Sequence, residues 1–408
     1  MADSGAAATE TGGRAATAGS GLRRWTQAFV LASAVGLIAA LLATGVGVDR
    51  TTVALLGVVG FVCPMVFGMG YLLLPPYAGR TLADDRLAGL HLLLATTGAS
   101  ALFAGRLQAA PPSLFAAGAV LWSAGVATFV GALTLTVAPV VRERGPAVLR
   151  GSEYPQRSTR VATAAIPVAI AYLVVATLGL AATPRVLGVA GVTLPQVLHL
   201  YATGFATLLV FALGARLLIG FFHVDLPRTG TGIVLLLGAV APAVLSGSLW
   251  RAPRFQVGAV IEGTAMVGYA GMVAFVALRT DRWRPGLWGV LLGALAGAAA
   301  VVAGGALAVG AGPAWLVGAH VTLVLGGFFP LTIAGYAYQF FPVTAGQFPG
   351  ASDRVALATI ALLAAGVGLQ VGGRPGAVES VRLAGTAVSL AGALGYAWLL
   401  AGRFSRDR

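Results

Sequence analysis

Residues 60–79 read GFVCPMVFGMGYLLLPPYAG, a run of twenty residues without one charged side chain. A bilayer core about 30 Å thick needs about 20 apolar residues to be crossed by a helix. The run therefore predicts part of a membrane span. Its glycines are typical of membrane helices, because small residues let neighbouring helices approach closely in lipid.

The composition of the whole chain supports the same class. Apolar residues make up 58% of the 408 residues, charged residues 10%, and the mean hydropathy is +0.89. Soluble domains carry roughly 25% charged residues. We therefore predict an all-α integral membrane protein of the cell membrane with about twelve spans, whose partner is the lipid bilayer. The expected spans are 26–46, 52–74, 87–105, 113–138, 161–182, 194–219, 230–249, 256–278, 286–310, 313–341, 355–372 and 377–401.

The net charge of +13 comes from arginines that lie between the apolar runs rather than on one basic face. They therefore indicate topology, not a nucleic-acid partner. With the N-terminus inside, 18 of the 26 fall in inner segments and one, Arg216, within a span. The positive-inside rule then predicts cytoplasmic N- and C-termini. The seven outer arginines are Arg50, Arg106, Arg185, Arg251, Arg254, Arg374 and Arg382.

An internal repeat divides the spans into three blocks of four. Residues 60–79 align without gaps to 327–346, GFFPLTIAGYAYQFFPVTAG, with seven identities, and Gly204-Phe205 gives a weaker echo. Each segment lies on the second helix of its block, which predicts a pseudo-threefold axis along the membrane normal. The expected parts are a disordered cytoplasmic tail 1–23, block one 24–140, an Arg-rich loop 141–160, block two 161–278, a second Arg-rich loop 279–285, block three 286–402 and a basic tail 403–408.

Ionisable groups inside spans are costly and are functional candidates by default. Glu262 is the one acid clearly within a span, and His199 and His320 are the two histidines well inside. Their spans run in the same direction, and each residue lies five to seven positions past the expected start. At about 1.5 Å per residue, all three are expected roughly 8–11 Å below the outer boundary.

Three blocks around one axis could bring these groups into one layer. Imidazoles are the usual axial ligands of haem and good ligands for copper, and a nearby carboxyl can relay protons. The competing interpretation is that each group only forms a hydrogen bond between helices.

The remaining polar groups are weaker candidates. Arg216 lies in the last turns of its span, where it could support a ligating side chain or extend toward the inner surface. His91 and His223 lie near cytoplasmic helix ends, where solvation at the interface is expected. Tyr336 and Tyr338, like Tyr201, are expected to pack rather than react. Cys63, the single cysteine, excludes an intrachain disulfide and a cysteine-ligated cluster.

Twelve helices in three blocks, with histidines on second helices, resemble the catalytic subunit of haem-copper oxidases. The tenth span, HVTLVLGGFFPLTIAGYAYQFFP, is similar to that family's pattern of His followed by Gly, Gly and Pro. A closer resemblance is to the NnrS family of haem- and copper-containing membrane proteins linked to nitric oxide metabolism. The residues that carry it are Gly60, Phe61, Gly68, Pro75, Gly79, Arg80, His199, Gly204, Arg216 and Gly220.

The departures from both families limit what the resemblance implies. Positions 53–59 lack the histidine expected before Gly60, and His223 is the sole candidate for the one expected after Arg216. The oxidases need six metal-ligating histidines, and this chain has four. The resemblance therefore implies at most one haem, or a copper ion, held by His199, His320 or both, and not a complete oxygen-reducing centre.

Three functions follow as hypotheses. The first is a haem or copper protein that handles a diatomic gas or its electrons, with electron-transfer or other membrane subunits as partners. The second is a transporter without a cofactor, for which Pro64 and Pro330 would mark helix kinks. The third is a scaffold subunit that has lost its cofactors.

Overall fold

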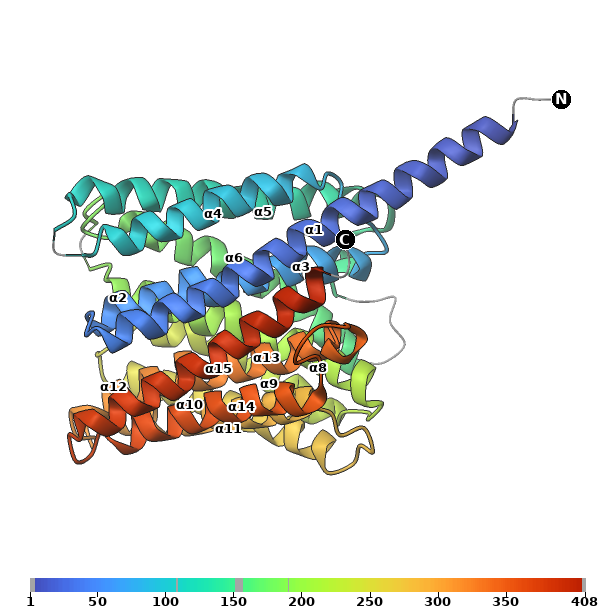
Figure 1. The fold of residues 1–408 in the computed structure, drawn as a ribbon. Helices are drawn as coiled ribbons and strands as arrows, with labels where there is room; N and C mark the ends of the chain where they lie inside the picture. The colour runs from blue at the N-terminus through green and yellow to red at the C-terminus, as the bar shows by residue number, and fades with distance from the viewer. Residues whose placement is uncertain (1–3, 108, 151–156, 190, 406–408) are drawn as a thin grey trace.

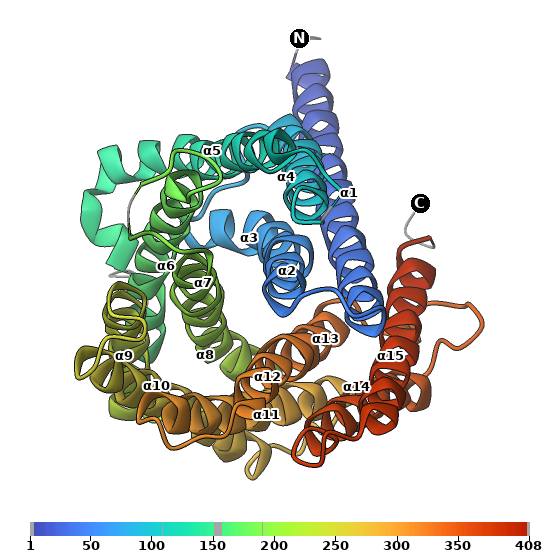
Figure 2. The ribbon, with the colours of Figure 1, turned by 90° about the vertical axis from the view of Figure 1, so that its left-hand side faces the viewer.

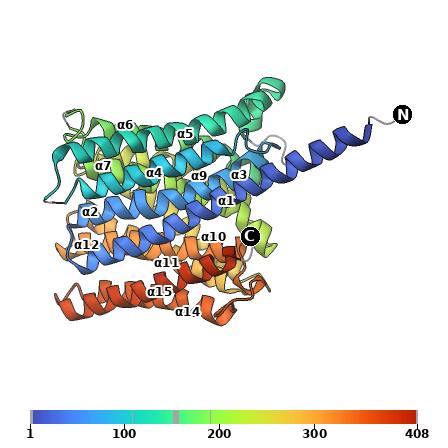
Figure 3. The ribbon, with the colours of Figure 1, turned by 45° about the horizontal axis from the view of Figure 1, so that its top comes forward.

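The computed structural model describes residues 4–107, 109–150, 157–189 and 191–405, with side chains from residue 21 on except at 112 and 157. This part of the chain forms helices and no strands. Twelve of its helices are long and apolar enough to cross a membrane, which confirms the predicted all-α, multi-pass architecture. The helices run side by side between two ends where the loops gather (Figures 1 and 3).

Of the twelve spans, the three composite ones lie inside a ring that the others form (Figure 2). The surrounding helices are α1 (Ser4–Gly45), α4 (Arg86–Ala104), α5 (Pro112–Arg144), α6 (Arg157–Ala182), α9 (Arg228–Gly247), α10 (Arg254–Ala277), α11 (Pro285–Ala308), α14 (Asp353–Gly372) and α15 (Glu379–Ser405). Two short 3-10 helices, η2 (Pro146–Arg150) and η5 (Val343–Ala345), lie in connections.

The inner three spans are composite helices, each with a π-helical segment between two α-helical ones. They are α2 (Arg50–Leu55), η1 (Leu56–Val62) and α3 (Cys63–Tyr77); α7 (Leu194–His199), η3 (Leu200–Thr207) and α8 (Leu208–Phe222); and α12 (Trp315–Thr322), η4 (Leu323–Phe328) and α13 (Phe329–Phe340). The most apolar windows of these spans are 78%, 67% and 50% buried, against 33–44% in the other nine. These three spans therefore form the centre of the bundle.

Proline accounts for two of the three π segments. Pro64 and Pro330 each lie in the first turn of the α-helix that follows the π segment. Proline has no N–H to donate and its ring collides with the carbonyl four residues earlier, so the preceding turn must widen or bend. Ser33 on α1 donates to the Phe61 carbonyl of η1 at 2.8 Å and so satisfies one carbonyl there. No proline follows η3, and nothing in the structure explains that segment.

Close helix contacts depend on glycine at a few positions. A Cβ on Gly36 of α1 would overlap the backbone of Gly60 in η1, and a Cβ on Gly289 of α11 would lie 2.8 Å from Gly335 Cα. Helices this close gain dispersion contacts that replace the hydrophobic effect in lipid. The short connection between α11 and α12 contains Gly310 at φ 70°, a conformation that favours glycine.

Two predicted boundaries differ from the structure. The first span was expected from residue 26, but the apolar part of α1 begins at Gly21, and the helix itself extends back to Ser4. Alanine has the highest helix propensity, and this extension is rich in it. The helix of the fourth span continues past the predicted residue 138 to Arg144. Its last turns are polar, so hydropathy alone does not reveal that they are helical.

Candidate functional site

A cavity of about 350 Å³ lies at the end of the bundle where α2, α7 and α12 begin. This is the end that faces the viewer in Figure 2. Its wall is mostly apolar and comes from the three inner spans, from α10 and α11, and from the connection after α9. The lining includes Arg50 and Trp250, which are exposed, so the cavity opens at this end.

Besides Arg50 at the opening, three ionisable side chains from three different spans line this cavity: His199, Glu262 and His320. These are the three residues that we expected in one layer, because they lie at similar depths along their spans. The structure therefore brings together residues that are separated by 121 positions in the sequence.

His199 is the last residue of α7, directly before η3. Its Nδ1 donates to the carbonyl of Pro195, one turn earlier, at 2.8 Å. Gln196 accepts from the backbone N–H of Thr193 at 2.8 Å and so fixes the start of this short helix. Contacts within residues 193–199 therefore hold both the start of this helix and the His199 imidazole in place.

His320 is held by a neighbouring helix instead. Its Nδ1 donates to the carbonyl of Ala300 on α11 at 2.9 Å. Gly304, one turn further along α11, lies under the ring, and a Cβ there would be 3.1 Å from Cε1 and 3.2 Å from Nδ1 of His320. The absence of a side chain at residue 304 therefore lets the imidazole pack closely against α11.

Both hydrogen bonds determine the same tautomer. A carbonyl oxygen can only accept, so Nδ1 carries the hydrogen and Nε2 of a neutral imidazole keeps its lone pair. Metal-ligating histidines are commonly oriented this way, with the other ring nitrogen donating to a backbone carbonyl. His199 and His320 thus each present an Nε2 that forms no hydrogen bond with the described residues.

Glu262 on α10 is only 7% exposed, and its Oε2 has no hydrogen-bond partner among the described residues. A buried carboxyl without a partner is costly in its charged form. It is therefore best accommodated as a neutral acid, or beside water or a polar ligand in the cavity.

The other candidate residues lie outside the cavity lining. Arg216 on α8 donates to Thr163 and lies over the ring of Tyr77, 3.7 Å from its centroid. Tyr336 hydrogen-bonds Tyr269 at 3.1 Å, and Tyr338 hydrogen-bonds Thr359 at 2.7 Å. His223 is exposed at the end of α8, as expected for a solvated position.

The expected solvation of His91 is wrong. Its side chain is fully buried, with Tyr71 OH 3.1 Å from Nδ1 and the rings of Phe29 and Phe67 packed around it. The position of His91 near the start of α4 predicts its depth, but the ring faces α1 and α3 rather than the interface. It lies apart from the cavity and serves the packing of block one.

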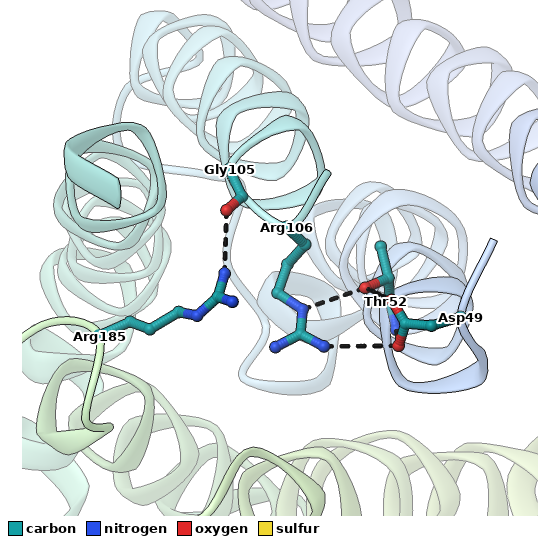
Figure 4. Close-up of polar contacts among 5 residues, drawn as sticks. All are labelled: Asp49, Thr52, Gly105, Arg106 and Arg185. Atoms are coloured by element: carbon teal, nitrogen blue, oxygen red, sulfur yellow. Dashed lines mark hydrogen bonds and ion pairs between the residues drawn. The ribbon is translucent and has the colours of Figure 1, made fainter. Parts of the chain in front are cut away.

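Polar residues at the cavity end were not predicted as a group. Arg106 donates to Thr52 Oγ1 at 3.0 Å and pairs with Asp49 at 3.4 Å, while Arg185 donates to the Gly105 carbonyl at 3.0 Å (Figure 4). Burial opposes ionisation of Asp49, but the hydrogen bonds from Thr52 and the charge of Arg106 outweigh it, so the pKa of this carboxyl is lowered. In the sequence, only their position at or near the ends of the expected spans distinguishes these residues.

Asp49 caps α2, whose first two residues, Arg50 and Thr51, line the cavity. The contacts of Arg106 therefore tie the entrance of the cavity to the end of α4.

The described residues contain no group of three or more His, Cys, Asp or Glu side chains close enough to hold a metal ion. The sequence matches no protein-family model, and no curated protein is significantly similar to it.

Proposed function

We propose that this chain is a divergent membrane protein of the NnrS and haem-copper-oxidase type, and that its cavity binds one haem through His199, His320 or both. The observation that supports it is that two imidazoles, each with a free Nε2, line one cavity between the inner spans. The role would be to handle a small diatomic ligand such as nitric oxide or oxygen, or its electrons. Cytoplasmic termini and a pseudo-threefold arrangement belong to the same proposal, supported by the arginine bias and the three composite inner helices.

The donor set fits a haem. Neutral imidazole is a common ligand of haem iron, and the walls around the two histidines are mostly apolar. A bound haem would supply an iron that changes oxidation state and binds a diatomic ligand, and His199, His320 or both would hold it. Glu262 would hold or release a proton at its carboxyl beside the bound group.

The donor set does not fit a copper centre of the oxidase kind. Such a centre needs several imidazoles around one ion, and the described residues bring together only two at this cavity. Copper is therefore not part of the proposed function.

The volume of the cavity favours a second candidate, a transporter of a small organic molecule. Small-molecule sites span roughly 300–1,000 Å³, and a cavity of about 350 Å³ is near the lower end of that range. A porphyrin would have to displace wall side chains or project through the opening. A smaller substrate would fit between His199 and Glu262 without such movement, and the opening at one end suits an outward-facing substrate site.

An absorption spectrum of the purified full chain, oxidised and dithionite-reduced, with metal analysis of the same sample, separates these candidates. Haem binding predicts a Soret band that shifts on reduction, at about one iron per chain, and a changed or lost band in His199→Ala and His320→Ala. The matched control is His223→Ala, which removes an exposed histidine away from the cavity and should leave the band unchanged.

Protein from cells supplied with iron and haem precursors that shows only the 280 nm band would contradict haem binding. Binding of a small organic molecule that is lost in Glu262→Gln would then support transport. Absence of both would support the scaffold hypothesis.

A further inference from the structure

The opening of the cavity carries an arginine that has no counterion among the described residues. Arg50 lines the cavity and is exposed, and it forms no hydrogen bond or ion pair with the described part of the chain. The neighbouring carboxylate, Asp49, is instead held by Arg106 and Thr52. A guanidinium keeps its charge at physiological pH and offers five N–H donors, so Arg50 is suited to bind an anionic group of a ligand.

The end of the bundle around the opening has a surplus of positive charge. The connections and helix ends on this side contain the seven outer arginines and two acids, Asp49 and Glu379. Both acids are paired, Asp49 with Arg106 at 3.4 Å and Glu379 with Arg382 at 2.5 Å. The other five arginines have no ion pair with a carboxylate in the described part of the chain. A surplus of one sign of charge around a cleft attracts ligands of the opposite sign from solution.

Two of these five arginines flank residues of the cavity wall. Arg251 and Arg254 are exposed, and each is the sequence neighbour of a lining residue, Trp250 and Phe255 respectively. The rings of Trp250 and Phe255 are 5.4 Å apart. The opening therefore combines positive charge with aromatic surface, which suits an anionic group that is attached to an apolar body.

Deeper in the cavity, the mostly apolar wall is interrupted by a second polar layer. His199, Glu262 and His320 lie five to eight residues past the starts of α7, α10 and α12, which places them roughly 8–12 Å below those helix starts. The two imidazole Nε2 atoms can each accept a hydrogen bond, and Glu262 Oε2 has no partner among the described residues. A ligand hydroxyl at this depth would donate to an Nε2 and so satisfy a polar atom that the protein leaves without a partner.

We propose that the ligand of this cavity is an amphipathic hydroxy acid, with a carboxylate at one end, an apolar middle and a hydroxyl at the other end. Arg50 binds the carboxylate at the opening, the apolar wall covers the middle, and His199 or His320 accepts the hydrogen bond of the hydroxyl. Arg50 is the one arginine in the cavity lining, which favours a singly charged carboxylate over a doubly charged phosphate.

The size of such a molecule agrees with the cavity. A chain of seven carbon–carbon bonds spans about 9 Å when it is extended, which is close to the depth of the second polar layer. A molecule of this length is small enough for a cavity of about 350 Å³. The proposal rests on the second candidate function, in which the cavity takes a small organic molecule and not a haem.

Calorimetric titration of the full chain in lipid nanodiscs tests the ligand class, with 8-hydroxyoctanoate as the probe and empty discs as the blank. The acid should bind about ten-fold more tightly than 8-hydroxyoctanamide, which has the same length but no charge. It should also bind several-fold more tightly than octanoate, which lacks the hydroxyl. Equal affinity for the acid and the amide would overturn the proposal, although the cavity would still be a site for a small organic molecule. Binding of neither probe would also overturn it, and the absorption spectrum would decide separately whether the cavity holds haem.

Arg50→Gln tests where the carboxylate binds. The variant should bind 8-hydroxyoctanoate about ten-fold more weakly than wild type and 8-hydroxyoctanamide equally well, because only the acid uses the charge. Arg382→Gln is the matched control, since it removes the same charge at the same end of the bundle from a residue outside the cavity lining. It should leave the affinity for the acid nearly unchanged. Equal weakening in both variants would show that the general positive charge of this end attracts the acid, and would overturn the assignment of the carboxylate to Arg50.

Discussion

At the scale of single residues, the two cavity histidines show how a backbone carbonyl can prepare a side chain for binding. His199 uses a carbonyl of its own helix and His320 uses one from α11, yet both orient Nε2 as the free nitrogen. Loss of such an orienting contact typically lowers ligand affinity by about 10–100-fold. The contact of His320 is the more vulnerable, because it depends on the spacing of two helices.

Adjacent glycines on α11 allow this to be tested. Gly304→Ala would place a Cβ 3.1–3.2 Å from the His320 ring, whereas Gly305→Ala would meet nothing within 4 Å. Alanine is favoured over glycine in a helix by about 1 kcal/mol. We therefore expect Gly305→Ala to raise the melting temperature and Gly304→Ala to raise it less or lower it, because the ring must shift. Thermal unfolding in detergent measures this, and equal gains for both variants would show that the ring moves freely.

Asp49 gives a prediction about pH. Its pKa in the folded protein is lowered, so the contact with Arg106 and Thr52 stabilises the fold above the ordinary aspartate pKa of about 3.9 and is lost as pH falls through the lower folded value. Asp49→Asn keeps a helix-capping side chain but removes the charge. We expect a loss of about 0–1 kcal/mol at neutral pH, since this side chain is 54% exposed.

The difference in melting temperature between wild type and Asp49→Asn should therefore shrink toward zero as the pH is lowered below about 4. Glu379→Gln, which removes an exposed pair with Arg382, is the control for a general effect of charge at this end. A difference that stays constant down to the acid limit would exclude the ion pair as its cause.

At the scale of elements, the hydropathy pattern predicts which segments span the membrane. It does not predict which neighbouring helix a given side chain faces. The twelve spans follow from apolar runs that lipid requires, and the common depth of His199, Glu262 and His320 follows from the rise per residue. The π segments could not be predicted, because these spans are apolar on nearly every side. One extra residue in a turn therefore leaves no visible change in the apolar pattern. His91 was misjudged for a similar reason, since depth along a helix does not tell which neighbour the side chain faces.

At the scale of the whole molecule, the cavity distinguishes one end of the bundle from the other. It opens at the end that carries Arg50, Arg106 and Arg185. If the arginine bias sets the orientation, the ligand enters from outside the cell. The side of the membrane from which the ligand enters therefore depends on topology.

Cysteine labelling of intact cells tests that topology. Ala311→Cys lies in the exposed connection between α11 and α12, and Asp281→Cys lies in the exposed connection between α10 and α11. A membrane-impermeant maleimide should modify the first in intact cells and the second only after permeabilisation, because the second loop belongs to the arginine-rich side. The native Cys63 is fully buried, so the background should be low, and the unmodified chain serves as the control. The reverse labelling pattern would place the cavity opening in the cytoplasm, and the ligand would then be a cytoplasmic one.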